Sequence, residues 1–185
     1  DSFSNAFGIY LQDQIDVTDR VKITLGGRGT FVDSTSRDIN TLATTNTQKD
    51  NSFTPRAGLV VLPTSITSIY FSFANSFQPN FAARSATGAQ FKPTTGRQFE
   101  GGVKQSLFRN RMFATLAVYE LTKRDVLVPD PANPFGFSIQ IGEQRSRGIE
   151  LDLNGQILPN LNLNFNYTPL DAAVTKDSQP DFVGD

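Results

Sequence analysis

Apolar and polar residues alternate along most of this 185-residue chain. The longest alternation runs from Ser138 to Leu158, with isoleucine and leucine at one set of alternate positions and charged or amide residues at the other. Successive side chains of a β-strand point to opposite faces, so this period of two predicts a strand with one apolar and one polar face. Strands of globular proteins average about five or six residues, so a strand of this length is unusual.

The same period predicts an all-β fold with no helix, an antiparallel meander of eight long strands. We expect these strands at 7–17, 21–33, 53–62, 67–77, 96–107, 112–126, 137–158 and 161–168. Short turns near 18–20, 63–66, 108–111 and 159–160 alternate with longer polar segments, which include 34–52 and 78–94. Short turns at one end and long loops at the other are typical of bacterial outer-membrane barrels.

The apolar positions of these strands are predicted to point outward, toward lipid. They are Ile9, Leu11, Ile23, Leu25, Phe71, Phe99, Val103, Leu151, Leu153 and Leu163. In a soluble barrel the same alternation would point inward, and the period alone does not distinguish the two. Charged residues in mid-strand, long strands and unequal loops favour a membrane barrel. A self-contained eight-stranded outer-membrane barrel, structural or adhesive, and a soluble ligand-binding β-barrel are the alternatives.

Composition narrows the possible chemistry. The chain has 17 Lys and Arg against 18 Asp and Glu, which gives no bulk attraction to nucleic acid. It contains no cysteine and no histidine, which excludes disulfides, thiolate metal sites and histidine-based catalysis within these residues. We therefore expect no enzyme activity, no metal site and no directly bound cofactor. The chain starts at Asp1 and its one methionine is Met112, so we expect a processed chain or a fragment.

Four segments, in order, resemble a known family. They are "YLQDQIDVTDRVKITLGGR" (10–28), "FTPRAGLVVLPTSITSIYFSFANSFQPN" (53–80), "FKPTTGRQFEGGVKQSLFRNRMFATLAVYELTKRDVLVPDP" (91–131) and "GEQRSRGIELDLNGQILPNLNLNFNYT" (142–168). The chain resembles TonB-dependent siderophore receptors of the bacterial outer membrane, in particular the ferric-hydroxamate, ferrichrome-like branch.

This resemblance implies a 22-stranded transmembrane β-barrel filled by an N-terminal plug. It implies import of iron carried as a ferric siderophore, with energy from the TonB system acting on the plug. Residues 1–185 would be a partial barrel domain of about eight strands, without the plug, the signal peptide or the C-terminal strand. The sequence departs from the family pattern at Pro169, where we expect the last strand to end because proline cannot donate to the ladder.

Two groups of residues are candidates for function. In the resembled family, polar positions inside the barrel face the plug, which suggests Arg28, Arg56, Glu100, Lys104, Gln144, Glu150 and Asp152. Solvation, or ion pairing between neighbouring strands, is the alternative role. Aromatic residues in or beside the outer loops are candidates to line a vestibule for the siderophore, namely Phe81, Phe91, Phe135 and Phe137. Loop packing or an interfacial girdle is their alternative role.

Three charges fall on the otherwise apolar face of the long strand: Glu143, Arg145 and Arg147. An arginine on the lipid face costs about 2–4 kcal/mol at the bilayer midplane and little near the interface. We therefore expect this part of the strand to lie beyond the hydrocarbon, near the lipid headgroups.

Overall fold

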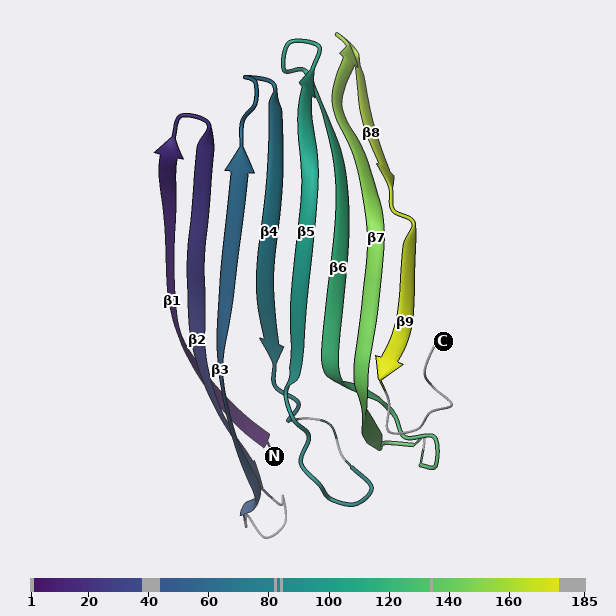
Figure 1. The fold of residues 1–185 in the computed structure, drawn as a ribbon. Helices are drawn as coiled ribbons and strands as arrows, with labels where there is room; N and C mark the ends of the chain where they lie inside the picture. The colour runs from purple at the N-terminus through teal and green to yellow at the C-terminus, as the bar shows by residue number, and fades with distance from the viewer. Residues whose placement is uncertain (1, 38–43, 82, 84, 134, 177–185) are drawn as a thin grey trace.

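A computed structural model describes residues 2–37, 44–81, 83, 85–133 and 135–176, which form a single sheet of nine strands (Figure 1). The strands are β1 (Ser2–Thr18), β2 (Val21–Arg37), β3 (Thr44–Val61), β4 (Thr67–Gln78), β5 (Thr94–Leu107), β6 (Met112–Pro129), β7 (Ser138–Leu158), β8 (Leu161–Tyr167) and β9 (Leu170–Lys176). The described residues include no helix long and apolar enough to cross a membrane.

Each strand pairs antiparallel with the next, in the order β1 to β8. The four short turns all lie at one end of the sheet, at the top of Figure 1, and the longer connections lie at the other. This arrangement confirms the predicted meander. The long strand is confirmed as well, since β7 has 21 residues and pairs with β6 along most of its length.

A ninth strand, beyond the eight ranges predicted, follows Pro169. Proline interrupts the ladder, as expected, but its carbonyl accepts a hydrogen bond from the Ile149 backbone N–H at 3.1 Å. The chain thus stays beside β7, and pairing resumes where Leu170 faces Gly148. A Cβ at Gly148 would lie 2.7 Å from the Pro169 carbonyl oxygen, so the close approach requires glycine.

The polar segment 34–52, predicted as a loop, is largely strand. β2 continues to Arg37 and β3 begins at Thr44, with Asp33 facing Lys49 across the ladder. Alternation could not reveal these extensions because both faces of the hairpin carry polar side chains. The remaining connection, 38–43, lies outside the described residues.

One face of the sheet is apolar across seven strands. Residues that face one another in the ladder form a row of Ile15, Ile23, Leu59, Phe71, Gly101, Val118 and Ile149. The next row toward the short turns contains Val21, Val61, Ile69, Val103, Leu116, Leu151 and Tyr167. All ten residues predicted to face lipid lie on this face, and many are exposed, Leu11 by 78%.

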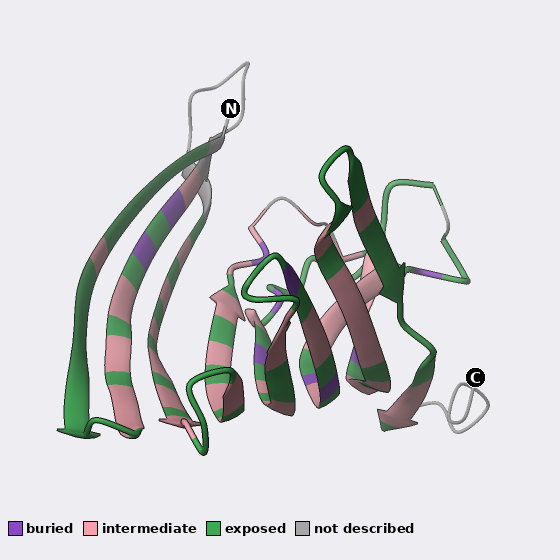
Figure 2. Ribbon diagram, turned by 90° about the horizontal axis from the view of Figure 1, so that it is seen from above, coloured by how far each residue is buried: buried purple, intermediate pink, exposed green. Residues whose placement is uncertain are grey.

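These apolar side chains do not converge into a closed core. Buried apolar residues in the described chain are few and scattered, namely Val32, Phe91, Met112, Ala117 and Ile141, and no large side chain is fully buried. Figure 2 shows exposed and half-buried stretches over almost all of the strands. The structure therefore does not support the soluble-barrel alternative, which needs its apolar side chains inside.

The sheet curves toward its polar face. Residues 91–92 contact both Gln48 of β3 and Gln140 of β7 from that face. A short segment reaches two strands so far apart in the sheet only across a concave side. We call the polar face the concave face and the apolar face the convex face.

The sheet is open. β1 pairs only with β2, and β8 and β9 pair only with β7, so the described strands do not close into an eight-stranded barrel. An unpaired edge cannot face hydrocarbon, because lipid offers no partner for backbone N–H and C=O groups. The sheet therefore has the form of a wall segment of a larger barrel.

The apolar belt crosses the ladder rows diagonally. On β1–β3 it extends outward to Phe7, Phe31 and Phe53, whereas on β6 and β7 charges replace it directly beyond Val118 and Ile149. Barrel strands tilt by about 35–45°, so residues paired in one ladder row lie at different depths in the membrane. The diagonal course of the apolar belt agrees with such a tilt.

Candidate functional site

All seven polar residues predicted to face the lumen lie on the concave face. The ladder register places Arg28, Arg56, Glu100, Lys104, Gln144, Glu150 and Asp152 there, opposite the apolar belt. Glu100, Glu150 and Asp152 form an acidic band across β5 and β7, with Lys104 in the same ladder row as Asp152. Arg28 lies farther toward the long loops.

Tyr70 is the centre of the acidic band. Its hydroxyl donates to Glu100 Oε1 at 2.7 Å, and Gln98 Nε2 donates to the other oxygen of Glu100 at 3.1 Å. The Lys104 ammonium lies 5.0 Å from the centre of the Tyr70 ring. Tyr70 was not among the predicted site residues, although it occupies the polar set of alternate positions in β4.

The acidic band is not neutralised by ion pairs within the described wall. Glu100, Glu150 and Asp152 take part in none of its salt bridges, and Asp152 instead accepts a hydrogen bond from Asn166. The alternative in which these carboxylates pair with cations on neighbouring strands is therefore not observed. The concave face presents negative charge on which a cationic partner would be stabilised.

Glycine lets the aromatic ring lie flat against this face. A Cβ at Gly102 would lie 2.8 Å from the Tyr70 ring and 2.7 Å from the Leu116 carbonyl oxygen. Any other residue would push the ring away from the wall and displace its hydroxyl from Glu100.

The basic candidates have different partners. The guanidinium carbon of Arg56 lies 4.9 Å from the centre of the Tyr10 ring, which is a cation–π distance. Arg28 Nε donates to Thr30 Oγ1 at 3.1 Å. Neither arginine is paired with a carboxylate in the described part of the chain.

The four candidate aromatics do not form one cluster. Phe81 lines a hollow of about 590 Å³ on the concave face, together with Arg28 and Thr30. Phe91 is buried, whereas Phe135 is 93% exposed in the loop between β6 and β7. Phe137 is also exposed, and its carbonyl accepts the Asp130 N–H. Phe91 is therefore placed to pack within the protein, whereas Phe81, Phe135 and Phe137 remain accessible to solvent.

The described residues of the segment 79–93, namely 79–81, 83 and 85–93, are called the strap, and amide side chains hold it across the concave face. Gln140 Nε2 donates to the Lys92 carbonyl at 2.7 Å, and Gln140 Oε1 accepts the Lys92 N–H at 3.0 Å. Gln48 Nε2 donates to the Phe91 carbonyl at 2.9 Å, and Asn80 also reaches the Lys92 carbonyl. The strap is therefore anchored to β3 and β7 at once.

The loop between β6 and β7 contains a compact turn at Asp130. Its carboxylate accepts hydrogen bonds from the Asn133 side chain at 3.0 Å and the Ala132 backbone at 2.9 Å. These bonds hold the pKa of Asp130 below its ordinary value, because they stabilise the ionised form. The turn fixes the start of the loop that carries Phe135 and Phe137.

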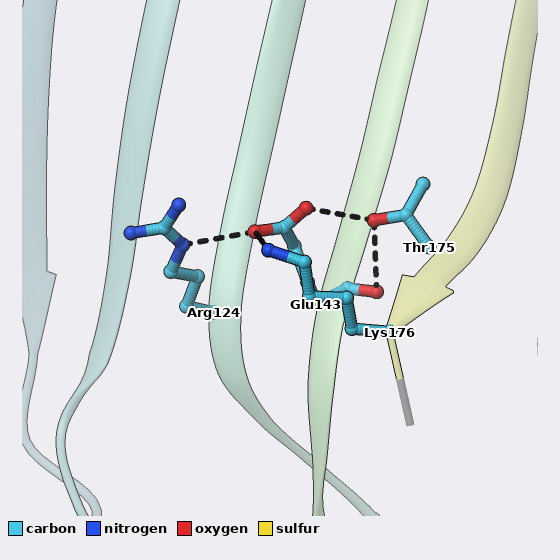
Figure 3. Close-up of polar contacts among 4 residues, drawn as sticks. All are labelled: Arg124, Glu143, Thr175 and Lys176. Atoms are coloured by element: carbon cyan, nitrogen blue, oxygen red, sulfur yellow. Dashed lines mark hydrogen bonds and ion pairs between the residues drawn. The ribbon is translucent and has the colours of Figure 1, made fainter. Parts of the chain in front are cut away.

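The charges on the convex face are mostly paired with one another. Glu143 accepts from Arg124 Nε and Thr175 Oγ1, both at 2.9 Å, and Lys176 Nζ lies 3.5 Å away (Figure 3). Arg147 pairs with Asp171 at 3.1 Å. These contacts connect β6, β7 and β9 beyond the apolar belt. The exposed Arg147–Asp171 pair is worth only about 0–1 kcal/mol, whereas the Glu143 side chain is 12% exposed. We assign both groups a local role in joining strands.

No group of three potential metal ligands occurs among the described residues. The arrangement offers surfaces for recognition: a convex belt for lipid, an acidic band, and three hollows. One hollow is that of Phe81, and a second, of about 340 Å³, is lined by residues of β6, β7 and β9. A third, of about 330 Å³, is lined by residues of β3, β4, β5 and β6.

Together these features define a wall segment of a membrane-spanning β-barrel with a charged interior. Comparison with known proteins identifies the family. The model of the "TonB dependent receptor-like, beta-barrel" family matches residues 1–185. The chain therefore belongs to the TonB-dependent receptor β-barrel family, and its place is the bacterial outer membrane.

Relatives with known names are receptors. The ferrichrome outer membrane transporter/phage receptor of Escherichia coli is 38% identical over 172 residues, covering 92% of this chain and 22% of that protein. The metal-pseudopaline receptor CntO of Pseudomonas aeruginosa is 35% identical over 181 residues, covering 94% of this chain and 25% of that protein. The chain thus spans about a quarter of the length of these relatives.

Solved structures agree on the fold. The siderophore receptor PiuA of Acinetobacter baumannii matches with a TM-score of 0.74 at 28% identity, covering 95% of this chain and 26% of that one. The ferripyoverdine receptor of Pseudomonas aeruginosa matches with a TM-score of 0.77 at 21% identity, covering 93% and 23%. The family consists of receptors and is not a family of enzymes.

Proposed function

We propose that the chain is part of the barrel wall of an outer-membrane receptor that imports ferric siderophores. The observation that carries the proposal is a sheet with a lipid-facing belt on one side and a charged concave face on the other, in a chain 38% identical to a ferrichrome transporter. Iron enters as a siderophore complex, and the wall itself holds no cofactor.

In this proposal the acidic band holds the plug. Glu100, Glu150 and Asp152 lie on the concave face without a cationic partner in the described wall, so a plug that presents arginine or lysine would neutralise them. Energy from the TonB system then acts on the plug, and the remaining strands of a 22-stranded barrel close the two open edges. Phe81, Phe135 and Phe137 contribute to the outer vestibule.

Uptake measurements test the function. The complete receptor that carries this segment is expressed in a strain without its own hydroxamate receptors, and uptake of a radiolabelled ferric trihydroxamate is followed. We expect saturable uptake that stops when the proton gradient is collapsed. Uptake no greater than that of the empty-vector strain, with the receptor present in the outer membrane, would contradict the proposal.

Charge variants test the role of the acidic band. Glu100→Gln combined with Glu150→Gln removes two negative charges while keeping the side-chain shapes. We expect the plug to be held less firmly, so that a bulky hydrophilic antibiotic enters more readily. The matched control is Glu120→Gln on the convex face, which should leave antibiotic sensitivity unchanged. If the Glu100/Glu150 double variant is no more sensitive to the antibiotic than the Glu120→Gln variant, the assignment of the acidic band to the plug is refuted.

A further inference from the structure

Two cationic residues outside the acidic band lie at the same level of the concave face. Lys123 faces Gly96 and Gln144, and Gly96 faces Ser76. Arg28 faces Thr54, and Thr54 and Ser76 each lie two residues beyond Arg56 and Ala74, the last pair of the β3–β4 ladder. The ladder is therefore interrupted between the two cations, and we call Arg28 and Lys123, with the residues at this level, the basic row.

Each cation of the basic row lines a hollow. Arg28 lines the hollow of about 590 Å³ beside Thr54, Ser76 and Phe81. Lys123 lines the hollow of about 340 Å³ beside Gln144 and Ser146. No carboxylate lines either hollow, and neither cation is paired with a carboxylate within the described residues.

The basic row lies nearer the mouth than the acidic band. Ser76 is four residues from Ser72, the residue that faces Glu100, which corresponds to about 13 Å along the strand. One carboxylate, Asp50, lies farther out on the same face and accepts a hydrogen bond from Gln48. The entrance thus presents positive charge at two hollows, with the carboxylate of Asp50 farther out and the acidic band deeper along the wall.

We propose that the basic row selects ferric chelates that carry peripheral anionic groups, with Arg28 and Lys123 each binding one anionic arm. The proposal rests on the proposed import function and adds a substrate class to it. β3 and β4 no longer pair at this level, so Arg28 and Lys123 lie on opposite sides of the gap between these strands. A chelate with carboxylates on two arms offers one to each cation, whereas a cationic chelate would be repelled by both residues.

The hydroxyl groups around the two cations support the same ligand chemistry. Thr30, Thr54 and Ser76 line the first hollow and Ser146 lines the second, and hydroxyl groups donate to carboxylate oxygens as arginine and lysine do. Phe81 adds an apolar surface at the edge of the first hollow. The strap is anchored to β3 and β7, and its residues Pro79 and Phe81 line the first hollow.

Calorimetric titration of the complete receptor in detergent tests the proposal. The probes are two ferric trihydroxamates with the same core, one with a neutral periphery and one with carboxylates on two arms. We expect the wild-type receptor to bind the dicarboxylate more tightly. Arg28→Gln and Lys123→Gln should each raise its Kd about tenfold, as loss of a charge-assisted contact does, and the double variant about a hundredfold. The Kd of the neutral chelate should change less than about twofold.

Arg20→Gln is the matched control, because it removes the same charge from the short turn between β1 and β2, at the opposite end of the sheet. It should change neither Kd. If the wild-type receptor binds both chelates equally and the Arg28 and Lys123 variants leave their ratio unchanged, the charge selection is refuted while import stands. If the wild-type receptor binds neither chelate, the proposed function fails and the selection fails with it.

Discussion

Replacing Phe71 by arginine tests which face of the sheet meets lipid. Phe71 lies on the convex face in the central apolar row, is 49% exposed, and its ring centre lies 6.3 Å from that of Phe99. An arginine near the bilayer midplane costs about 2–4 kcal/mol, and loss of an aromatic pair adds about 0.5–1.5 kcal/mol. We expect Phe71→Arg to lower the free energy of unfolding of the complete receptor by about 3–5 kcal/mol.

Ser72→Arg is the matched control, one residue away on the opposite face. Ser72 faces Glu100 across the β4–β5 ladder, so an arginine there meets water and a carboxylate, and its effect should lie within about 1 kcal/mol of zero. Guanidinium titration of receptor folded into vesicles measures both free energies. If the two variants cost the same, or Ser72→Arg costs more, the convex face does not meet hydrocarbon and the assignment of faces is refuted.

The other predictions concern the strap, the turn, the edge and the isolated chain. Gln140→Ala should raise the mobility of a spin label at Thr87, because it removes both bonds to Lys92, whereas Gln144→Ala on the same face should not. The lowered pKa of Asp130 means that its turn is fully held above about pH 3.8 and is lost as the pH falls through that lowered pKa, so amide exchange at Ala132 should accelerate only in acid. Gly148→Val should separate β9 from β7 and expose the Ile149 N–H to exchange, because a Cβ would meet the Pro169 carbonyl oxygen. Residues 1–185 alone, secreted into a receptor-deficient strain, should give no energy-dependent siderophore uptake, because both edges of the described sheet are unpaired; saturable uptake would contradict the wall-segment interpretation.

Alternation was sufficient to predict the membrane part of the wall. Where one face of a strand meets hydrocarbon and the other meets water, apolar and polar residues alternate along the strand, as at Ile149, Glu150 and Leu151. The period vanishes where both faces meet water. That is why the outer part of the hairpin between β2 and β3, from Asp33 to Lys49, could not be recognised as strand.

The candidate site was only partly predictable, for a related reason. Alternation assigned Glu100 and Glu150 to the correct face, because a face is a property of one strand. Alternation could not predict which residues of different strands or loops contact one another. Such contacts join residues distant in sequence, such as Tyr70 and Glu100 or Lys92 and Gln140. The interruption at Pro169 was predicted from its missing N–H, but the return of pairing at Leu170 was not, because it depends on the Pro169 carbonyl and the opposite Gly148.

The separation of charge along the concave face bears on how the two proposed roles coexist. An anionic chelate held at Arg28 and Lys123 lies about 13 Å from the row of Glu100, which exceeds the screening length of about 8 Å at physiological ionic strength. The acidic band therefore repels the chelate little at the entrance but opposes its passage deeper along the bare wall. A plug whose cations cover Glu100 and Glu150 removes that repulsion, so the carboxylates that hold the plug also require it to be present. Substituting Glu100 and Glu150 by glutamine should then leave the chelate Kd nearly unchanged while weakening retention of the plug. These two measurements distinguish the role of the acidic band from that of the basic row.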